Sequence, residues 1–238
     1  MVVRLLFPLR YGGRQAPKEG NVRFMAILAA AGCLMAGGAA AAAENALDLL
    51  DAPVPYTGHF YVSSPAGTFS GTVWHQPGRE RREWATAGGS QAVLLDRTAD
   101  AAYLLQPAGK WYVGIGLHAA AGLAGGLDKL NVDRRRLGET TMDGMRVTRY
   151  RVTAAGKFDG EAWFSRDGIP IKVAGTLTEP DGRKAQVETG LTQVTVGRTD
   201  PAMLTLPAGY FGMDLRSVPA AKLNQTVAGL KPLLEGHH

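Results

Sequence analysis

Between residues 158 and 213 the apolar residues follow the alternating pattern of half-buried strands. From Ile169 to Thr178 one parity carries mostly branched apolar side chains, while the other carries Pro, Lys, Ala and Thr. A period of two places one of these sets on the covered face of a sheet. Asp167-Gly168 and Asp181-Gly182 stand between such runs, and Asp-Gly supplies the positive φ angles of tight hairpins. We therefore predict antiparallel strands with one buried face.

The same pattern extends through most of the chain and predicts a meander of about ten strands. In the last strand the apolar parity changes, and we place a bulge at Gly190 to account for it. After Tyr210 the strand pattern ends, and Ser217 to Leu230 is predicted to form a terminal helix. Besides Ile169 to Thr178, the predicted strands cover residues 59–64, 69–76, 79–85, 91–97, 101–106, 110–115, 132–140, 145–153, 158–165 and 183–196.

One segment departs from this alternation. Between Gly114 and Leu130 the apolar residues recur at helical spacing, with Leu117, Leu123 and Leu127 among them. The glycines in this stretch each cost up to about 1 kcal/mol relative to Ala, so the predicted helix is weakly held. Two interpretations stay open: a movable flap over the sheet, and an ordinary connecting helix packed at its edge.

The start of the chain resembles a targeting segment. Residues 24–43 carry no charge, follow Arg23 and end in a run of alanines, which is typical of a secretory signal peptide. Cleavage after Ala43 divides the chain into a leader, residues 1–43, and one domain, residues 44–238. Two alternatives stay open: an uncleaved membrane anchor, and a lipoprotein acylated at Cys33 within Ala30-Ala31-Gly32-Cys33.

The leader accounts for most of the basic balance. Of the 26 Lys and Arg and 21 Asp and Glu residues, five basic and one acidic lie in residues 1–43, which leaves 21 and 20 in the predicted domain. A net charge of about +1 gives no support for nucleic-acid binding, which needs clustered positive charge. Because Cys33 is the single cysteine, the exported domain is also expected to lack disulfides and thiolate metal sites.

Residues that would support catalysis or metal binding are scattered. His59, His75 and His118 have no partner at ligand spacing, and no serine lies in a Gly-x-Ser-x-Gly elbow. We therefore predict no metal, no cofactor and no catalytic residue. Two groups of arginines are expected to lie on a solvated strand face, and the alternative that they line a mouth for lipid phosphates stays open; these are Arg79, Arg81, Arg82, and Arg134, Arg135, Arg136 with Arg149 and Arg151.

Two phrases of the sequence are similar to one known family. Residues 161–172, EAWFSRDGIPIK, resemble an aromatic strand, turn and Gly-Leu-Pro phrase, and residues 203–210, MLTLPAGY, resemble the phrase F-x-L-P-x-G-Y. Together with the order and spacing of the strands, they resemble the LolA/LolB superfamily of periplasmic lipoprotein and lipid carriers over most of residues 55–215. The chain departs from the best-known carrier in its shorter flap.

This resemblance implies a mainly β fold, an antiparallel half-barrel whose concave face is covered by helices and encloses an apolar cavity. It also implies a periplasmic protein that binds a lipid or acyl chain. The alternative is a non-catalytic module that docks another envelope protein. Either way, contact with a membrane is expected to be transient, or held by a lipid anchor if Cys33 is acylated. The residues expected to line the cavity and flap are Trp111, Val113, Ile115, Leu117, Leu123, Leu127, Ile171 and Val173.

Overall fold

The computed structural model describes residues 44, 45, 48, 51–65, 67–86, 89–123, 129–179, 181–218 and 222. In this part of the chain thirteen strands form one sheet. The predicted leader, residues 1–43, and Leu127 lie outside the described residues, and so does the predicted terminal helix except for residues 217, 218 and 222. Among the described residues, no helix combines the length and the apolar character needed to cross a membrane.

The strands follow one another mostly as hairpins, as the Asp-Gly and Pro-Gly turns predict. In sheet order they are β1 (Glu44–Asn45), β8 (Asn131–Met142), β9 (Met145–Ala154), β10 (Phe158–Ser165), β11 (Pro170–Thr178), β12 (Lys184–Val196), β2 (Tyr56–Ser64), β3 (Gly67–Gln76), β4 (Arg79–Thr86), β5 (Gly89–Asp96), β6 (Ala101–Gln106), β7 (Trp111–Gly116) and β13 (Phe211–Asp214). Every neighbouring pair is antiparallel except β13, which runs parallel to β7.

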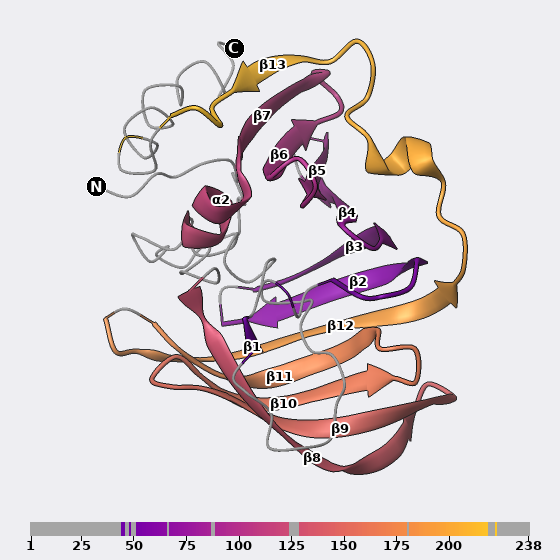
Figure 1. Cartoon of the computed structure of the whole chain (residues 1–238), viewed down its shortest axis with the longest axis vertical. Helices are drawn as coiled ribbons and strands as arrows, with labels where there is room; N and C mark the ends of the chain where they lie inside the picture. Colours follow the sequence, from indigo (N-terminus) through magenta and orange to yellow (C-terminus); the bar gives the residue numbers. More distant parts are fainter. Residues whose placement is uncertain are drawn as a thin grey trace, which may run out of the picture.

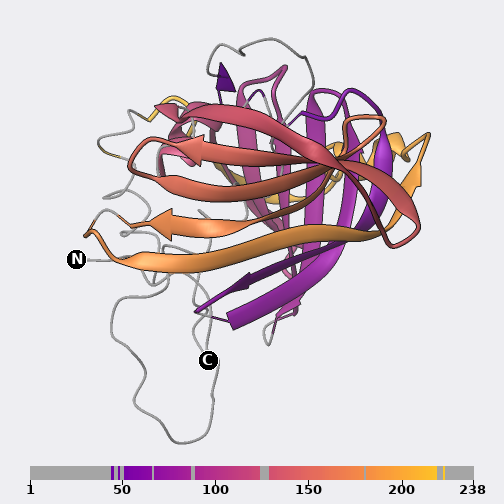
Figure 2. The same ribbon diagram turned by 90° about the horizontal axis from the view of Figure 1, so that it is seen from below.

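The sheet is open and strongly curled. Figure 1 shows it as a C, with β8 to β12 below, β4 to β7 above, and helix α2 (Leu117–Leu123) inside the opening. Figure 2 shows β8 to β12 crossing β3 to β7 at a steep angle, which is the accumulated right-handed twist of many neighbouring strands. The predicted mainly β, antiparallel fold is therefore confirmed.

The inner face of the C carries the core. Ala162 on β10 is opposite Val173 on β11 and Tyr150 on β9. Ala162 and Val173 form a buried cluster with Val152, Phe164 and Val132, and Tyr150 packs against it. A second cluster follows on β12, β2, β3 and β4, with Phe60, Val62, Val73, Trp84 and Leu191 among its buried members. Because opposite residues of paired strands share a face, this continuous apolar row defines the concave side.

A second layer covers part of the outer face. After β12 the chain passes through a 3-10 helix, η3 (Pro201–Leu204), whose Leu204 is buried. The following residues Leu206 and Tyr210 pack on Leu94 and Leu105, which point away from the concave side. Figure 1 shows this segment running along the outside of the C toward β13.

Two local predictions were wrong. The ladder between β12 and β2 shifts between Thr192 and Thr195, where Gln193 has a positive φ of 51°, and not at Gly190. Gly190 pairs regularly with Tyr61, whose ring lies over it: a Cβ there would be 2.6 Å from the Tyr61 hydroxyl. The glycine is needed for this close ring contact and not for a bulge. The second prediction was that the strand pattern ends at Tyr210, whereas Phe211–Asp214 forms β13.

Candidate functional site

An exposed apolar strip lies where the sheet ends at β13. Phe211 is opposite Trp111 and Met213 is opposite Val113, so these four side chains share the concave face. We call them the apolar lip. Phe211 is 69 % exposed and Met213 37 % exposed, and they are two of the four large hydrophobic residues found exposed in the described part of the chain. Exposure of adjacent large apolar side chains is typical of a binding surface.

The lip leads into a buried cluster. One step further along the same rows, Ile115 is 8 % exposed and Leu215 is 6 % exposed, and both pack with Leu117 and Ala102. Val113 belongs to the lip and also packs against this cluster. The apolar row therefore passes without interruption from solvent into the buried cluster against which α2 packs.

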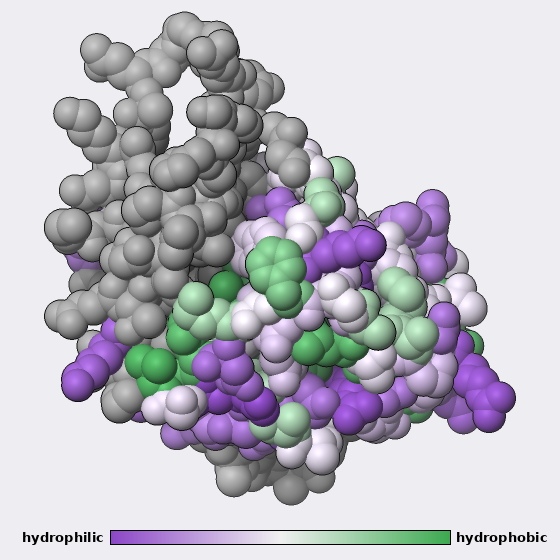
Figure 3. Space-filling view, turned by 90° about the horizontal axis from the view of Figure 1, so that it is seen from above, coloured by the Kyte–Doolittle hydropathy of each residue, from purple (hydrophilic) through white to green (hydrophobic). Residues whose placement is uncertain are grey.

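Helix α2 covers this cluster mainly with small side chains. Ala119 and Ala120 pack against it, Leu117 begins the helix, and Gly122 has open space around its Cα. The helix begins directly after β7, and the Leu117 amide donates a hydrogen bond to the carbonyl oxygen of Asp100, the residue before β6. Figure 3 shows the molecule from the side where β13 and β7 lie, with apolar residues exposed between charged ones.

A charged pair on the opposite face fixes the end of β13. Arg216 Nε lies 2.9 Å from both carboxylate oxygens of Asp214, and the guanidinium lies 6.0 Å from the Tyr103 ring centroid. The hydrogen bond from Arg216 lowers the pKa of Asp214. The pair lies at the surface, so it orients the strand end and contributes little to stability.

The structure separates the residues that we predicted to line one cavity. Trp111 and Val113 lie in the lip, and Ile115 and Leu117 lie in the cluster beneath it. Ile171 and Val173 are also on the concave face, but they belong to two other clusters on β11, with β12 and β2 to β6 between them and β7. The side chain of Leu123 and all of Leu127 lie outside the described residues.

Our sequence analysis missed Phe211 and Met213, because it placed no strand after Tyr210. The available signal was the alternation of Phe211, Met213 and Leu215 with Gly212 and Asp214. This alternation was too short to distinguish a strand from a loop. The parallel pairing with β7, which makes the segment a strand, joins residues far apart in sequence.

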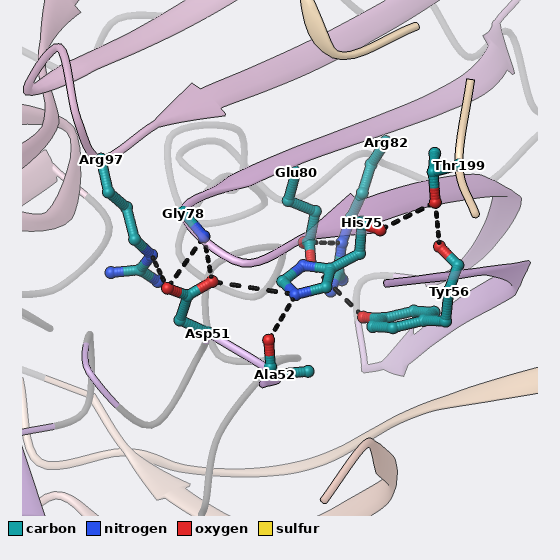
Figure 4. A network of polar contacts seen from close by, with 9 residues as sticks. All are labelled: Asp51, Ala52, Tyr56, His75, Gly78, Glu80, Arg82, Arg97 and Thr199. Carbon is teal, nitrogen blue, oxygen red and sulfur yellow. Dashed lines mark hydrogen bonds and ion pairs between the residues drawn. The ribbon is translucent and has the colours of Figure 1, made fainter. Parts of the chain in front are cut away.

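A buried polar network lies on the concave face of β3 and β4 (Figure 4). Glu80 accepts a hydrogen bond from Arg82 Nε at 2.7 Å, and its other oxygen lies 3.2 Å from His75 Nδ1. His75 Nε2 lies 2.9 Å from the Ala52 carbonyl oxygen, and the ring stacks on Tyr56. Burial alone would raise the pKa of Glu80, but the charge of Arg82 and the hydrogen bond from His75 lower it to about 2.

This network connects the start of the domain to the sheet. Asp51 accepts hydrogen bonds from the Gly78 amide at 2.7 and 3.0 Å, and its carboxylate lies 3.8 Å from Arg97 Nε. Thr199, which follows β12, donates to the carbonyl oxygens of His75 and Tyr56. Three segments distant in sequence are therefore held at one point, which indicates a structural role.

Our prediction for two of the arginines was wrong. Arg81 and Arg82 are buried, at 5 % and 4 % exposure, and lie on opposite faces of β4. Arg81 bonds to Glu83 and Arg82 bonds to Glu80, so neither faces solvent nor a lipid mouth. The Pro77-Gly78 turn was the sequence signal for the His75–Glu80 contact, because a two-residue turn places His75 opposite Glu80 on the neighbouring strand.

Among the described residues, no group of three His, Cys, Asp or Glu side chains is arranged to hold a metal ion. The absence of catalytic residues and cofactors stays a prediction.

No protein-family model matches the sequence, and no curated protein matches it. The chain is similar in structure to several solved proteins, of which three are described. An uncharacterized conserved protein from Thermus thermophilus is 11 % identical, with a TM-score of 0.47, and the match covers 68 % of this chain and 91 % of that one. The complex of Pseudomonas aeruginosa MucA/MucB is 19 % identical, with a TM-score of 0.41 and coverage of 63 % and 54 %.

The third is the LolA superfamily protein NE2245 from Nitrosomonas europaea, 10 % identical, with a TM-score of 0.34 and coverage of 64 % and 90 %. It bears the superfamily name to which the sequence resemblance pointed. The match spans just over half the length of the matched chain in the MucA/MucB complex. At these scores the similarities carry no argument about function, which is argued from the structure below.

Proposed function

We propose that this protein is exported and binds or carries a hydrophobic ligand, a lipid or acyl chain, which enters over the apolar lip. The observation that supports the proposal is the apolar row that passes from Phe211, 69 % exposed, to Ile115, 8 % exposed, along the concave face. An acyl chain lying along this row would cover the exposed rings and gain about 0.8 kcal/mol for each buried methylene.

Helix α2, which covers the apolar row, supports entry of the ligand at the β13 end of the sheet. Helix α2 is seven residues long, and beyond Leu117 at its start it meets the cluster through Ala119 and Ala120, so displacing the helix after Leu117 breaks few large contacts. The ligand would then replace Ala119 and Ala120 as the neighbour of Ile115 and Ala102. This favours the interpretation of α2 as a movable flap over that of an ordinary connecting helix.

The proposed location is the periplasm, and it rests on the sequence of the leader. Residues 1–43 have the charge and hydropathy pattern of a signal peptide, and lipidation at Cys33 is the alternative. Both place the domain where lipids and lipoproteins must cross an aqueous space. In this proposal the protein is not an enzyme.

Two measurements test the proposal. Native mass spectrometry of protein purified from its own cell envelope is expected to show a bound lipid. A fluorescent fatty acid is expected to bind the purified protein, and Phe211→Asp is expected to weaken that binding at least tenfold, because it places a charge in the lip. Val196→Asp serves as the control, since Val196 is also exposed, at 45 %, and lies on β12 outside the lip. Absence of bound lipid together with equal binding by both variants would refute the proposal.

A further inference from the structure

The apolar lip is exposed in the described part of the chain, and further apolar sequence follows it. Phe211 is 69 % exposed and Met213 is 37 % exposed. Twenty residues, 219–238, come after Val218 in the sequence, and Lys222 is the one among them that the structure describes. Adjacent exposed side chains of this size commonly mark a surface that a partner or ligand covers. The residues after β13 are the nearest candidates, because they are covalently joined to it.

The described chain turns back beside the buried end of the lip. The Leu215 amide donates to the Gly114 carbonyl oxygen at 2.7 Å, and the Val218 amide donates to the Leu215 carbonyl oxygen at 2.9 Å. A hydrogen bond between residues i and i+3 is typical of a turn. Val218 also packs on the buried cluster that includes Ile115 and Leu215. The residues after Val218 therefore start next to the apolar row.

The sequence after Val218 has the pattern of an amphipathic helix. Leu223, Val227 and Leu230 follow the spacing i, i+4 and i+7, which places their side chains on one face of a helix. That spacing places three polar residues away from this face; they are Lys222, Asn224 and Gln225. Such a helix has one apolar stripe that needs a covered surface.

The described residues at this point agree with that pattern. Ser217 lies in a turn and Val218 in a bend, whereas Lys222 is helical and exposed. The predicted helix therefore begins after Val218 and not at Ser217. Pro219 suits the first turn of a helix, because an amide at that position would have no partner within the helix.

The predicted helix and the lip are similar in length. A helix over residues 219–230 would be about 18 Å long at 1.5 Å per residue. The row from Phe211 to Leu215 extends about 13 Å at 3.3 Å per residue. A helix that returns along this row from Val218 runs antiparallel to β13. Its apolar residues then come opposite those of the row, which gives the pairs Leu223 with Leu215, Val227 with Met213, and Leu230 with Phe211.

We propose that residues 219–230 form a helix that lies along the apolar lip, covers Phe211 and Met213, and must be displaced before a hydrophobic ligand binds there. The covering of the lip stands on the geometry of β13 and Val218 alone. The competition with a ligand rests on the proposed function.

The chain's own segment is favoured over a second copy of the protein. The helix would start directly after Val218, which already packs beside the lip. A short connection of this kind gives an effective concentration in the millimolar range, which exceeds the concentration of a free second copy in ordinary solutions. The lip is therefore covered within one molecule.

Covering the lip changes how tightly a ligand binds. A ligand that enters over the lip binds only the uncovered state, so its apparent dissociation constant rises in inverse proportion to the population of that state. The coupling is reciprocal, and bound ligand must also displace the helix. The C-terminal segment thus sets the affinity of the site without contacting the buried cluster at Ile115.

Disulfide formation in the full-length chain tests the covering without any ligand. Cys33→Ser removes the single cysteine of the sequence. In this background Met213→Cys with Val227→Cys is expected to form an intramolecular disulfide at least tenfold faster than Met213→Cys with Gln225→Cys, the control on the opposite helix face. Non-reducing gels and mass spectrometry measure the rate, and circular dichroism checks that both variants are folded.

Binding of a fluorescent fatty acid tests the competition. Val227→Asp places a charge on the apolar stripe and is expected to bind the fatty acid at least tenfold more tightly than the wild type. Gln225→Asp adds the same charge on the other face and is expected to bind like the wild type. Excess fatty acid is expected to slow the disulfide between positions 213 and 227 at least tenfold.

The proposal is overturned if the two cysteine pairs oxidise at equal rates, or if the disulfide joins two molecules, which would assign the lip to a second copy. It is also overturned if Val227→Asp and Gln225→Asp bind the fatty acid equally. If neither variant nor the wild type binds the fatty acid, the ligand proposal and the competition both fail. The disulfide comparison then decides the covering of the lip by itself.

Discussion

Replacing Glu80 by Gln removes the one carboxylate in the described structure that lies beside both buried Arg82 and buried His75 (Figure 4). Arg82 is 4 % exposed, so its charge would lose its closest compensation in a medium of low dielectric constant. Removing one partner of a buried ion pair typically costs about 3–5 kcal/mol. For a domain of this size, such a loss lowers the melting temperature by roughly 10 °C.

The pKa of Glu80 gives an independent magnitude. Its ordinary value is 4.5, and its folded value is about 2. A depressed carboxyl pKa stabilises the folded state fully above the unfolded value, and this contribution is lost as pH falls from about 4.5 toward 2. The shift corresponds to about 3 kcal/mol, in agreement with the mutational figure.

The assay is urea unfolding of the wild type and of Glu80→Gln at a series of pH values. The difference in free energy of unfolding is expected to be largest near neutral pH and to shrink between pH 4.5 and 2. The matched control is Glu161→Gln, which removes the surface pair with Arg149 and is expected to cost less than about 1 kcal/mol. If both variants lose the same free energy, or if the difference does not change with pH, the reasoning about the buried network is wrong.

Three further predictions concern packing. Gly190→Ala is expected to lower the free energy of unfolding by more than about 1 kcal/mol, because the new methyl would lie 2.6 Å from the Tyr61 hydroxyl; thermal unfolding measures it, and an unchanged melting temperature would contradict the ring contact. Thr199→Val is expected to cost about 1 kcal/mol through the hydrogen bonds to the His75 and Tyr56 carbonyl oxygens, and urea unfolding that matches the wild type would contradict it. Gly122→Ala is expected to stabilise the protein by up to about 1 kcal/mol, because a Cβ there meets nothing within 4 Å; a lower melting temperature would show that α2 is constrained by more than its own propensity.

The strands were predictable because their signals are local. The alternation around Ile171 and Val173 and the Asp143-Gly144 turn, with φ angles of 48° and 77°, specify strands and hairpins without reference to the rest of the chain. Alternation also placed Trp111, Val113 and Ile115 together on the concave face of β7. It did not reveal that Ile171 and Val173 lie several strands away from them.

The lip was not predictable, because its two halves come from distant segments. Nothing near Phe211 specifies a parallel pairing with Trp111, and β13 has only four residues. The burial of Arg82 was partly predictable: the turn at Gly78 places Glu80 opposite His75, but the concave face had to be known before those charges were recognised as buried.

The amino-acid sequence by itself determined that this chain forms an antiparallel, mostly hairpin-connected sheet with one apolar face, since side-chain period and turn chemistry act over a few residues. Only the tertiary structure decided where the sheet ends, which apolar residues remain exposed there, and which charges are buried. Those properties depend on the curl of the whole sheet and on pairings such as β13 with β7, and each of these joins residues that no local pattern connects.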